Sequence, residues 1–295
     1  MIKSLRLPTM VVGLSLAGAA LACSPDGSTG FVPANKMNIP VGFKGLNGGL
    51  TQVQFNNAID KVVGVYSPIV SNLGARLVVD RKWTNGEVNA YAERSPDQRT
   101  WGVSMFGGLA RHPSITEDAM SLVVCHEIGH HIGGAPKKKI SVNKWSSAEG
   151  QADYFANLKC LRKVFLNDNN VAITATLGAP ANLVATCKAL YKNDVEDTAL
   201  CVRMSMAGKS VAGLFADLAR SPEARFETAD RTVVASVFEA HPKAQCRLDT
   251  FFQAALCDVN MNEDVSQTDE VKGTCHSSLG QRYGVRPLCW FKPSR

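Results

Sequence analysis

The chain has 295 residues, of which 45% are hydrophobic and 20% charged, and its formal net charge is +6. This composition is typical of a globular protein and excludes a disordered or collagen-like chain. After residue 22, no stretch reaches the ~18 apolar residues that a membrane-spanning helix needs. The run Lys137-Lys138-Lys139 has no interleaved aromatic residues, so it predicts a solvated loop and no binding of nucleic acid.

Residues 1–22 predict a signal peptide. Lys3 and Arg6 form a short positive region, residues 10–22 are apolar, and residues 20–22 (Ala-Leu-Ala) supply the small residues that a signal peptidase requires. The apolar run is too short and too rich in small residues for a stable transmembrane helix. The chain is therefore expected to be exported.

Cys23 directly follows the predicted cleavage site. Residues 21–23 (Leu-Ala-Cys) resemble a bacterial lipobox, in which the cysteine is lipidated and becomes the mature N-terminus. Ser24 stands where an aspartate favours inner-membrane retention, so we expect an anchor in the outer membrane facing the periplasm. Secretion without an anchor is the alternative, and the lipid would be the only membrane contact. Residues 23–50 are rich in Gly, Pro, Ser and Asn and predict a flexible tether.

A helix and a small sheet are predicted after the tether. Apolar residues recur at helical spacing over residues 51–73, which predicts the first helix. Residues 76–80 predict a strand. Residues 88–92 and 100–106 are rich in β-branched and aromatic residues and flank a turn, which indicates a β-hairpin.

The helix after this hairpin carries the most informative motif of the chain. Thr116 can cap its start, and Gly133-Gly134 can end it. His126 and His130 are four residues apart, so their imidazoles lie on one helical face and can hold one zinc ion. Glu127 points toward the same cleft and can take a proton from water. The alternative is a pair of surface histidines on an ordinary helix.

A catalytic zinc site needs a third protein ligand. Ser146 or Ser147 can cap a helix that runs to about Phe165, and on this helix Glu149 and Asp153 share one face. Glu149 can be the third ligand, and Asp153 can accept the second ring N–H of a zinc-bound histidine. The alternative is an exposed acidic helix start with a favourable dipole interaction.

The second half of the chain predicts further helices, at residues 181–191, 194–207, 208–219 and 242–256. An irregular tail follows. We therefore expect an α+β fold in which residues 51–295 form a single domain with a helical, cysteine-rich C-terminal half.

Eight cysteines remain when Cys23 is set aside, an even number that suits a disulfide framework in an exported chain. Cys246 and Cys257 would lie about 16 Å apart on one helix, too far for a bond that needs Cα atoms within about 7 Å. The tail cysteines Cys275 and Cys289 are candidate partners for Cys257. Cys125 is either part of this framework or a buried free thiol.

Several of these segments match one known group of enzymes. The zinc motifs at 126–130 and 149–153 match it, residues 88–92 (Val-Asn-Ala-Tyr-Ala) resemble its Asn-Ala-Phe-Ala strand, and residues 240–248 resemble its His-Pro followed by Arg-Ile. The chain thus resembles a gluzincin metallopeptidase of the group of the CAAX prenyl endopeptidases and their periplasmic relatives, such as the β-barrel assembly-enhancing protease.

The resemblance implies a zincin-type catalytic domain with Zn²⁺ held by His126, His130 and Glu149, and with Glu127 as the general base. It implies that the strand at Asn89 and Ala90 pairs with an extended peptide substrate.

We also make predictions for three side chains that are neither ligands nor the general base. The resemblance implies that His241 either stabilises the oxyanion or blocks the open metal position, and the alternative is an ordinary residue at a helix start. Arg247 can pair with a carboxylate such as Asp153, or lie on the surface. His131 is about 100° round the helix from His130, so we interpret it as structural.

The favoured hypothesis is an exported zinc endopeptidase acting on a protein or peptide substrate. The alternative from another class is a protease-like envelope lipoprotein that acts as a chaperone or binding module. A third hypothesis is a secreted toxin or predatory protease without an anchor.

Overall fold

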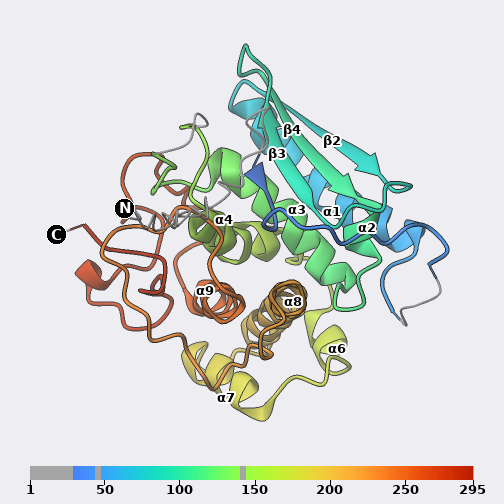
Figure 1. The fold of residues 1–295 in the computed structure, drawn as a ribbon. Helices are drawn as coiled ribbons and strands as arrows, with labels where there is room; N and C mark the ends of the chain where they lie inside the picture. Colours follow the sequence, from blue (N-terminus) through green and yellow to red (C-terminus); the bar gives the residue numbers. More distant parts are fainter. Residues whose placement is uncertain (1–28, 44–47, 140–143, 295) are drawn as a thin grey trace, which may run out of the picture.

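A small β-sheet packs on one side of a set of helices in the computed structural model, which describes residues 29–43, 48–139 and 144–294 (Figure 1). The fold is α+β, as predicted. The predicted signal peptide and the lipidation site at Cys23 lie outside the described residues. Within the described ranges, none of the helices combines the length and apolar character that crossing a membrane requires.

The sheet has the strand order β1-β3-β4-β2. The predicted hairpin is confirmed, because β3 and β4 pair antiparallel with Ala92 opposite Val103. Strand β2 pairs parallel with β4 on the other side. The strands are β1 (Thr29–Gly30), β2 (Arg76–Lys82), β3 (Ala90–Arg94) and β4 (Thr100–Phe106).

The described part of the predicted tether is folded into the domain. Strand β1 pairs antiparallel with β3, and the backbone N–H of Phe31 donates to the carbonyl of Ala90 at 2.8 Å. Phe31 and Val32 are buried. The prediction of a flexible tether over residues 23–50 is therefore wrong for these residues, because backbone pairing and apolar burial hold them against the sheet.

Helix α3 (Glu117–Ile132) lies in the middle of the molecule, between the sheet and helix α8 (Val195–Ala219) (Figure 1). The hydroxyl of Thr116 accepts from the N–H of Ala119, which confirms the predicted cap. The helix ends at Gly133, and Gly134 has a φ of +86° that favours glycine. Every residue of α3 from Ala119 to His131 is buried, as expected for a helix packed on all sides.

Helix α1 (Gln52–Asn72) confirms the first predicted helix and packs on α3. Helix α4 (Glu149–Phe155) continues through a π-helical segment (Ala156–Leu161) into α5 (Arg162–Val164). The predicted serine cap of α4 is wrong. Ala148 occupies the cap position, and the hydroxyl of Ser147 donates to the carbonyl of Gly134 instead.

Helix α8 packs on α3 on the side away from the sheet, and the other C-terminal helices pack on α8 (Figure 1). Helix α8 is continuous, so the prediction of two helices divided at residue 208 is wrong. A Cβ at Gly208 would lie 2.5 Å from Phe251 Cβ, so this glycine allows close packing between helices rather than a break. The remaining helices are α2 (Gly107–Ala110), α6 (Asn170–Thr174), α7 (Ala181–Leu190), α8 (Val195–Ala219), α9 (Ala244–Leu256) and the 3₁₀ turn η2 (Ser277–Leu279).

Four disulfides join the eight cysteines of the described residues. Cys257 pairs with Cys275, one of its two predicted partners. The alternative of a free thiol at Cys125 is wrong, because Cys125 is bonded to Cys160. The other two bonds are Cys187–Cys201 and Cys246–Cys289.

The contact between Gly150 and Trp290 gives a test of this packing. A Cβ at Gly150 would lie 2.2 Å from Trp290 Cδ2, whereas a Cβ at Gly64 in α1 would meet no atom within 4 Å. We expect Gly150→Ala to lower the free energy of unfolding by about 1–3 kcal/mol through overpacking. Gly64→Ala, the matched control, should raise it by up to about 1 kcal/mol. Urea unfolding of both variants measures this, and equal stabilities would contradict the packing.

Candidate metal centre

Three side chains meet in the interior, two from α3 and one from α4. The Nε2 atoms of His126 and His130 lie 3.3 and 3.6 Å from Glu149 Oε2. All three residues are fully buried, and their ligand atoms are close enough together to hold one metal ion. We call His126, His130 and Glu149 the metal centre. The structure thus brings together the three ligands predicted from the sequence.

The atoms that face each other in the metal centre have no hydrogen-bond partner among the described residues. These atoms are the two Nε2 nitrogens and Glu149 Oε2. Buried polar atoms without partners each cost roughly 1–3 kcal/mol. A cation bound between them would satisfy all three at once, and two imidazoles with one carboxylate form a donor set that suits zinc.

The other ring nitrogens are engaged, which orients the imidazoles. His126 Nδ1 donates to Asp153 Oδ1 at 2.7 Å, and His130 Nδ1 donates to the Ser147 carbonyl at 3.0 Å. Both Nε2 lone pairs are therefore left for a metal ion. Burial acts to lower the pKa of His126, but the neighbouring Asp153 carboxylate outweighs it and brings the pKa to about 9. A more basic imidazole is also a stronger metal ligand.

Lys138 holds Glu149 in its ionised form, although the sequence predicted that this lysine lies in a solvated loop. Lys138 Nζ lies 2.7 Å from Glu149 Oε1, and the lysine side chain is only 11% exposed. Burial acts to raise the pKa of Glu149, but the Lys138 ammonium holds it well below its usual value. The prediction of a solvated loop is thus wrong for Lys138, whose partner lies in another element.

Glu127 lies next to the metal centre without being one of the three ligands. Its side chain is fully buried, and neither carboxylate oxygen has a hydrogen-bond partner among the described residues. Burial raises the pKa of Glu127 to about 8. A general base works best when its pKa is close to the operating pH, so this environment suits proton transfer.

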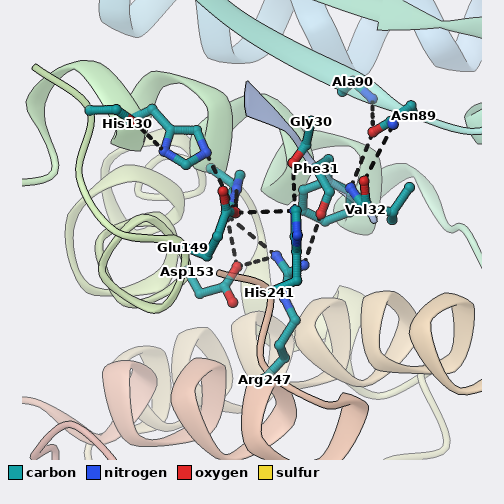
Figure 2. Close-up of polar contacts among 12 residues, drawn as sticks. Gly30, Phe31, Val32, Asn89, Ala90, His130, Glu149, Asp153, His241 and Arg247 are labelled. Carbon is teal, nitrogen blue, oxygen red and sulfur yellow. Dashed lines mark hydrogen bonds and ion pairs between the residues drawn. The ribbon is translucent and has the colours of Figure 1, made fainter. Parts of the chain in front are cut away.

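His241 and Arg247 approach the metal centre from the C-terminal half (Figure 2). His241 Nε2 lies 3.6 Å from Glu149 Oε2 and donates to the carbonyl of Gly30 at 2.6 Å. Burial lowers the pKa of His241, which favours the neutral ring. Arg247 is fully buried and forms the predicted ion pair with Asp153.

The strand predicted to pair with substrate is already paired with the chain itself. The carbonyl of Ala90 accepts from the N–H of Phe31, and the side chain of Asn89 accepts from the N–H of Val32 at 3.1 Å (Figure 2). The edge at Asn89 and Ala90 is therefore occupied in this structure, and its pairing with a substrate stays a prediction. The reason for the occupied edge is the non-local pairing of β1 with β3.

His131 has the structural role that the sequence suggested. Its ring is stacked between Trp101 and Trp145, with centroid distances of 5.2 and 4.9 Å. Arg94 Nε donates to His131 Nδ1 at 3.2 Å. Burial, together with the charge of Arg94, lowers the pKa of His131 to about 3, so the ring stays neutral.

No protein-family model matches the chain, and neither a curated protein nor a solved structure matches it.

Removal of one ligand should separate metal binding from folding. Glu149→Gln keeps the shape of the side chain but removes its charge. We expect zinc to bind at least about 100-fold more weakly, beyond the 10–100-fold that loss of an orienting partner causes. Metal content after dialysis and competition with a coloured chelator measure this, with circular dichroism as the check on folding.

His112→Ala is the matched histidine control, because His112 contacts Asp217 at 3.0 Å instead of the metal centre. His130→Ala should lose zinc, whereas His112→Ala should retain it. Equal zinc content in the two histidine variants would exclude the metal centre described here.

Proposed function

We propose that the chain is an exported zinc-dependent endopeptidase. The observation that carries this proposal is that three ligand atoms and the Glu127 carboxylate, all in one buried site, have no hydrogen-bond partner in the part of the chain that the structure describes. Two imidazoles, one carboxylate and an open position make up a donor set used by zinc hydrolases. A purely structural zinc site would have no need for an additional carboxylate without a partner.

The chain's own residues can carry the proton transfers of peptide hydrolysis. When bound, zinc supplies a Lewis acid that polarises the peptide carbonyl and makes water more acidic. Glu127 accepts a proton from the attacking water and returns it to the leaving amine, so that water is added across the C–N bond. His241 can donate a hydrogen bond to the substrate carbonyl, as it does to Gly30 here.

The proposed location follows from the covalent framework. Four disulfides in a chain of this size are typical of an oxidising compartment outside the cytosol. Together with the predicted signal peptide, they support export. The lipid anchor at Cys23 remains part of this proposal, with the outer membrane as its site and secretion as the alternative.

A binding or chaperone function is the second candidate. The complete burial of the metal centre favours it, because a hydrolase must admit both water and a substrate. The Glu127 carboxylate, which has no hydrogen-bond partner among the residues described, favours hydrolysis instead. The two functions differ in one measurable respect, which is whether peptide bonds are broken.

Glu127→Gln should separate zinc binding from catalysis. We expect the variant to keep its zinc and to lose casein hydrolysis by about 10²–10⁴-fold, the contribution typical of a general base. Because residues 29–32 cover the site, the chain with Glu127 and the chain with Glu127→Gln are also compared when both carry Phe31→Ala. If a zinc-loaded chain with glutamine at position 127 cleaved casein as fast as its Glu127 counterpart, the mechanism would be wrong.

A further inference from the structure

The chain's own residues 29–32 lie where a peptide would enter the metal centre. Thr29 and Gly30 pair antiparallel with β3, and the backbone N–H of Phe31 donates to Ala90 at 2.8 Å. The side chain of Asn89 accepts from the N–H of Val32 and donates to its carbonyl, at 3.1 and 3.4 Å. Addition of an extended strand to a sheet edge is a common way of binding a peptide.

The carbonyl of Gly30 points toward His241, next to the metal centre. It accepts from His241 Nε2 at 2.6 Å, and the same nitrogen lies 3.6 Å from Glu149 Oε2 (Figure 2). The peptide bond between Gly30 and Phe31 therefore has its carbonyl beside a metal-centre ligand. The scissile carbonyl of a substrate must likewise lie beside the metal centre.

The side chain of Phe31 fills a closed pocket with aromatic and cationic walls. Its ring meets the rings of His126 and Phe215 edge-on, at centroid distances of 4.9 and 5.6 Å. The Arg247 guanidinium lies 4.6 Å from the ring centre, and Arg247 Nη1 donates to the Phe31 carbonyl at 2.9 Å. Such walls suit a large aromatic side chain, through edge-to-face and cation–π contacts.

The site before this pocket fits glycine closely. A Cβ at Gly30 would lie 3.0 Å from Asn89 Nδ2 and 3.1 Å from Tyr91 Cε1. Both distances are tighter than ordinary contacts, so a larger residue would displace one of these side chains. The groove therefore matches a glycine followed by an aromatic residue, which is the order in the chain itself.

The burial of the centre is consistent with an internal occupant. His126, Glu127, His130 and Glu149 are all fully buried, and Phe31 packs directly on His126. We propose that residues 29–32 occupy the substrate groove as an internal pseudo-substrate, and that the groove accepts extended peptides in which glycine precedes a large aromatic residue. The substrate assignment rests on the proposed endopeptidase function, and an external peptide must displace residues 29–32 in order to bind.

A labelled peptide tests this occupancy without requiring hydrolysis. The probe is fluorescein-labelled Thr-Gly-Phe-Val-Pro-Ala-Asn-Lys, which copies residues 29–36, and the protein is the zinc-loaded full chain with Glu127→Gln. We expect Phe31→Ala in this background to bind the probe at least about tenfold more tightly, because the internal competitor is weakened. Val41→Ala is the matched control, since Val41 belongs to the same N-terminal segment but is 55% exposed. A probe with alanine in place of phenylalanine should not bind.

Hydrogen exchange gives a second measurement that does not depend on the Phe31 variant folding. In the Glu127→Gln chain, saturating probe should accelerate hydrogen exchange at the amides of Phe31 and Val32. The bound probe would replace their hydrogen bonds to Ala90 and Asn89. Unchanged exchange at these two amides when the probe is bound would show that residues 29–32 are a permanent strand and would overturn the proposal.

Failure of the groove assignment and failure of the peptidase mechanism would give different experimental results. If the Phe31→Ala chain binds the probe but does not hydrolyse casein when Glu127 is intact, the groove stands and the peptidase mechanism fails. If casein is hydrolysed but the probe neither binds nor competes, the peptidase stands and the assignment of residues 29–32 fails.

Discussion

A buried ion pair between Arg247 and Asp153 joins the parts of the molecule that build the metal centre. Arg247 comes from α9 and Asp153 from α4, and the same carboxylate accepts from His126 of α3. A buried pair offsets its desolvation only when its remaining groups are well placed. Here the guanidinium also donates to Phe31 and lies 3.9 Å from the ring centre of Phe215. The C-terminal half therefore completes a site whose ligands come from the first half.

A disulfide bond also connects the two helices that carry the metal-centre residues. The Cys125–Cys160 bond joins α3, one residue before His126, to the π-helical segment that continues α4. The side chain of Asn157 in that segment donates to two backbone carbonyls, which fixes its position against α8 and α9. Stretches of π-helix are frequent at functional sites. Together these bonds join the two ligand-bearing helices. Within the described ranges the ligand atoms lack hydrogen-bond partners, a cost that the rest of the fold must offset.

The parts of the site that the sequence predicted correctly depend on short-range spacing. His126 and His130, like Glu149 and Asp153, are four residues apart, so helical periodicity alone places each pair on one face. The cap at Thr116 and the hairpin are equally local signals. The prediction failed where contacts between distant segments decide the structure, as at residue 208, where two helices were predicted to meet but Gly208 lies within α8 and accommodates Phe251. Gly150 has a similar role against Trp290.

Access to the site could not be predicted, because it depends on contacts between distant segments. A strand of two residues has no periodicity, and the composition around it is that of a loop. Any extended segment can pair with the edge of β3, since backbone hydrogen bonds carry no sequence preference. What selects residues 29–32 is the fit of Gly30 under Asn89 and of Phe31 against Arg247, which is 216 residues away. The identity of the ligands is thus a local property of the sequence, whereas the occupant of the groove is a property of the folded chain.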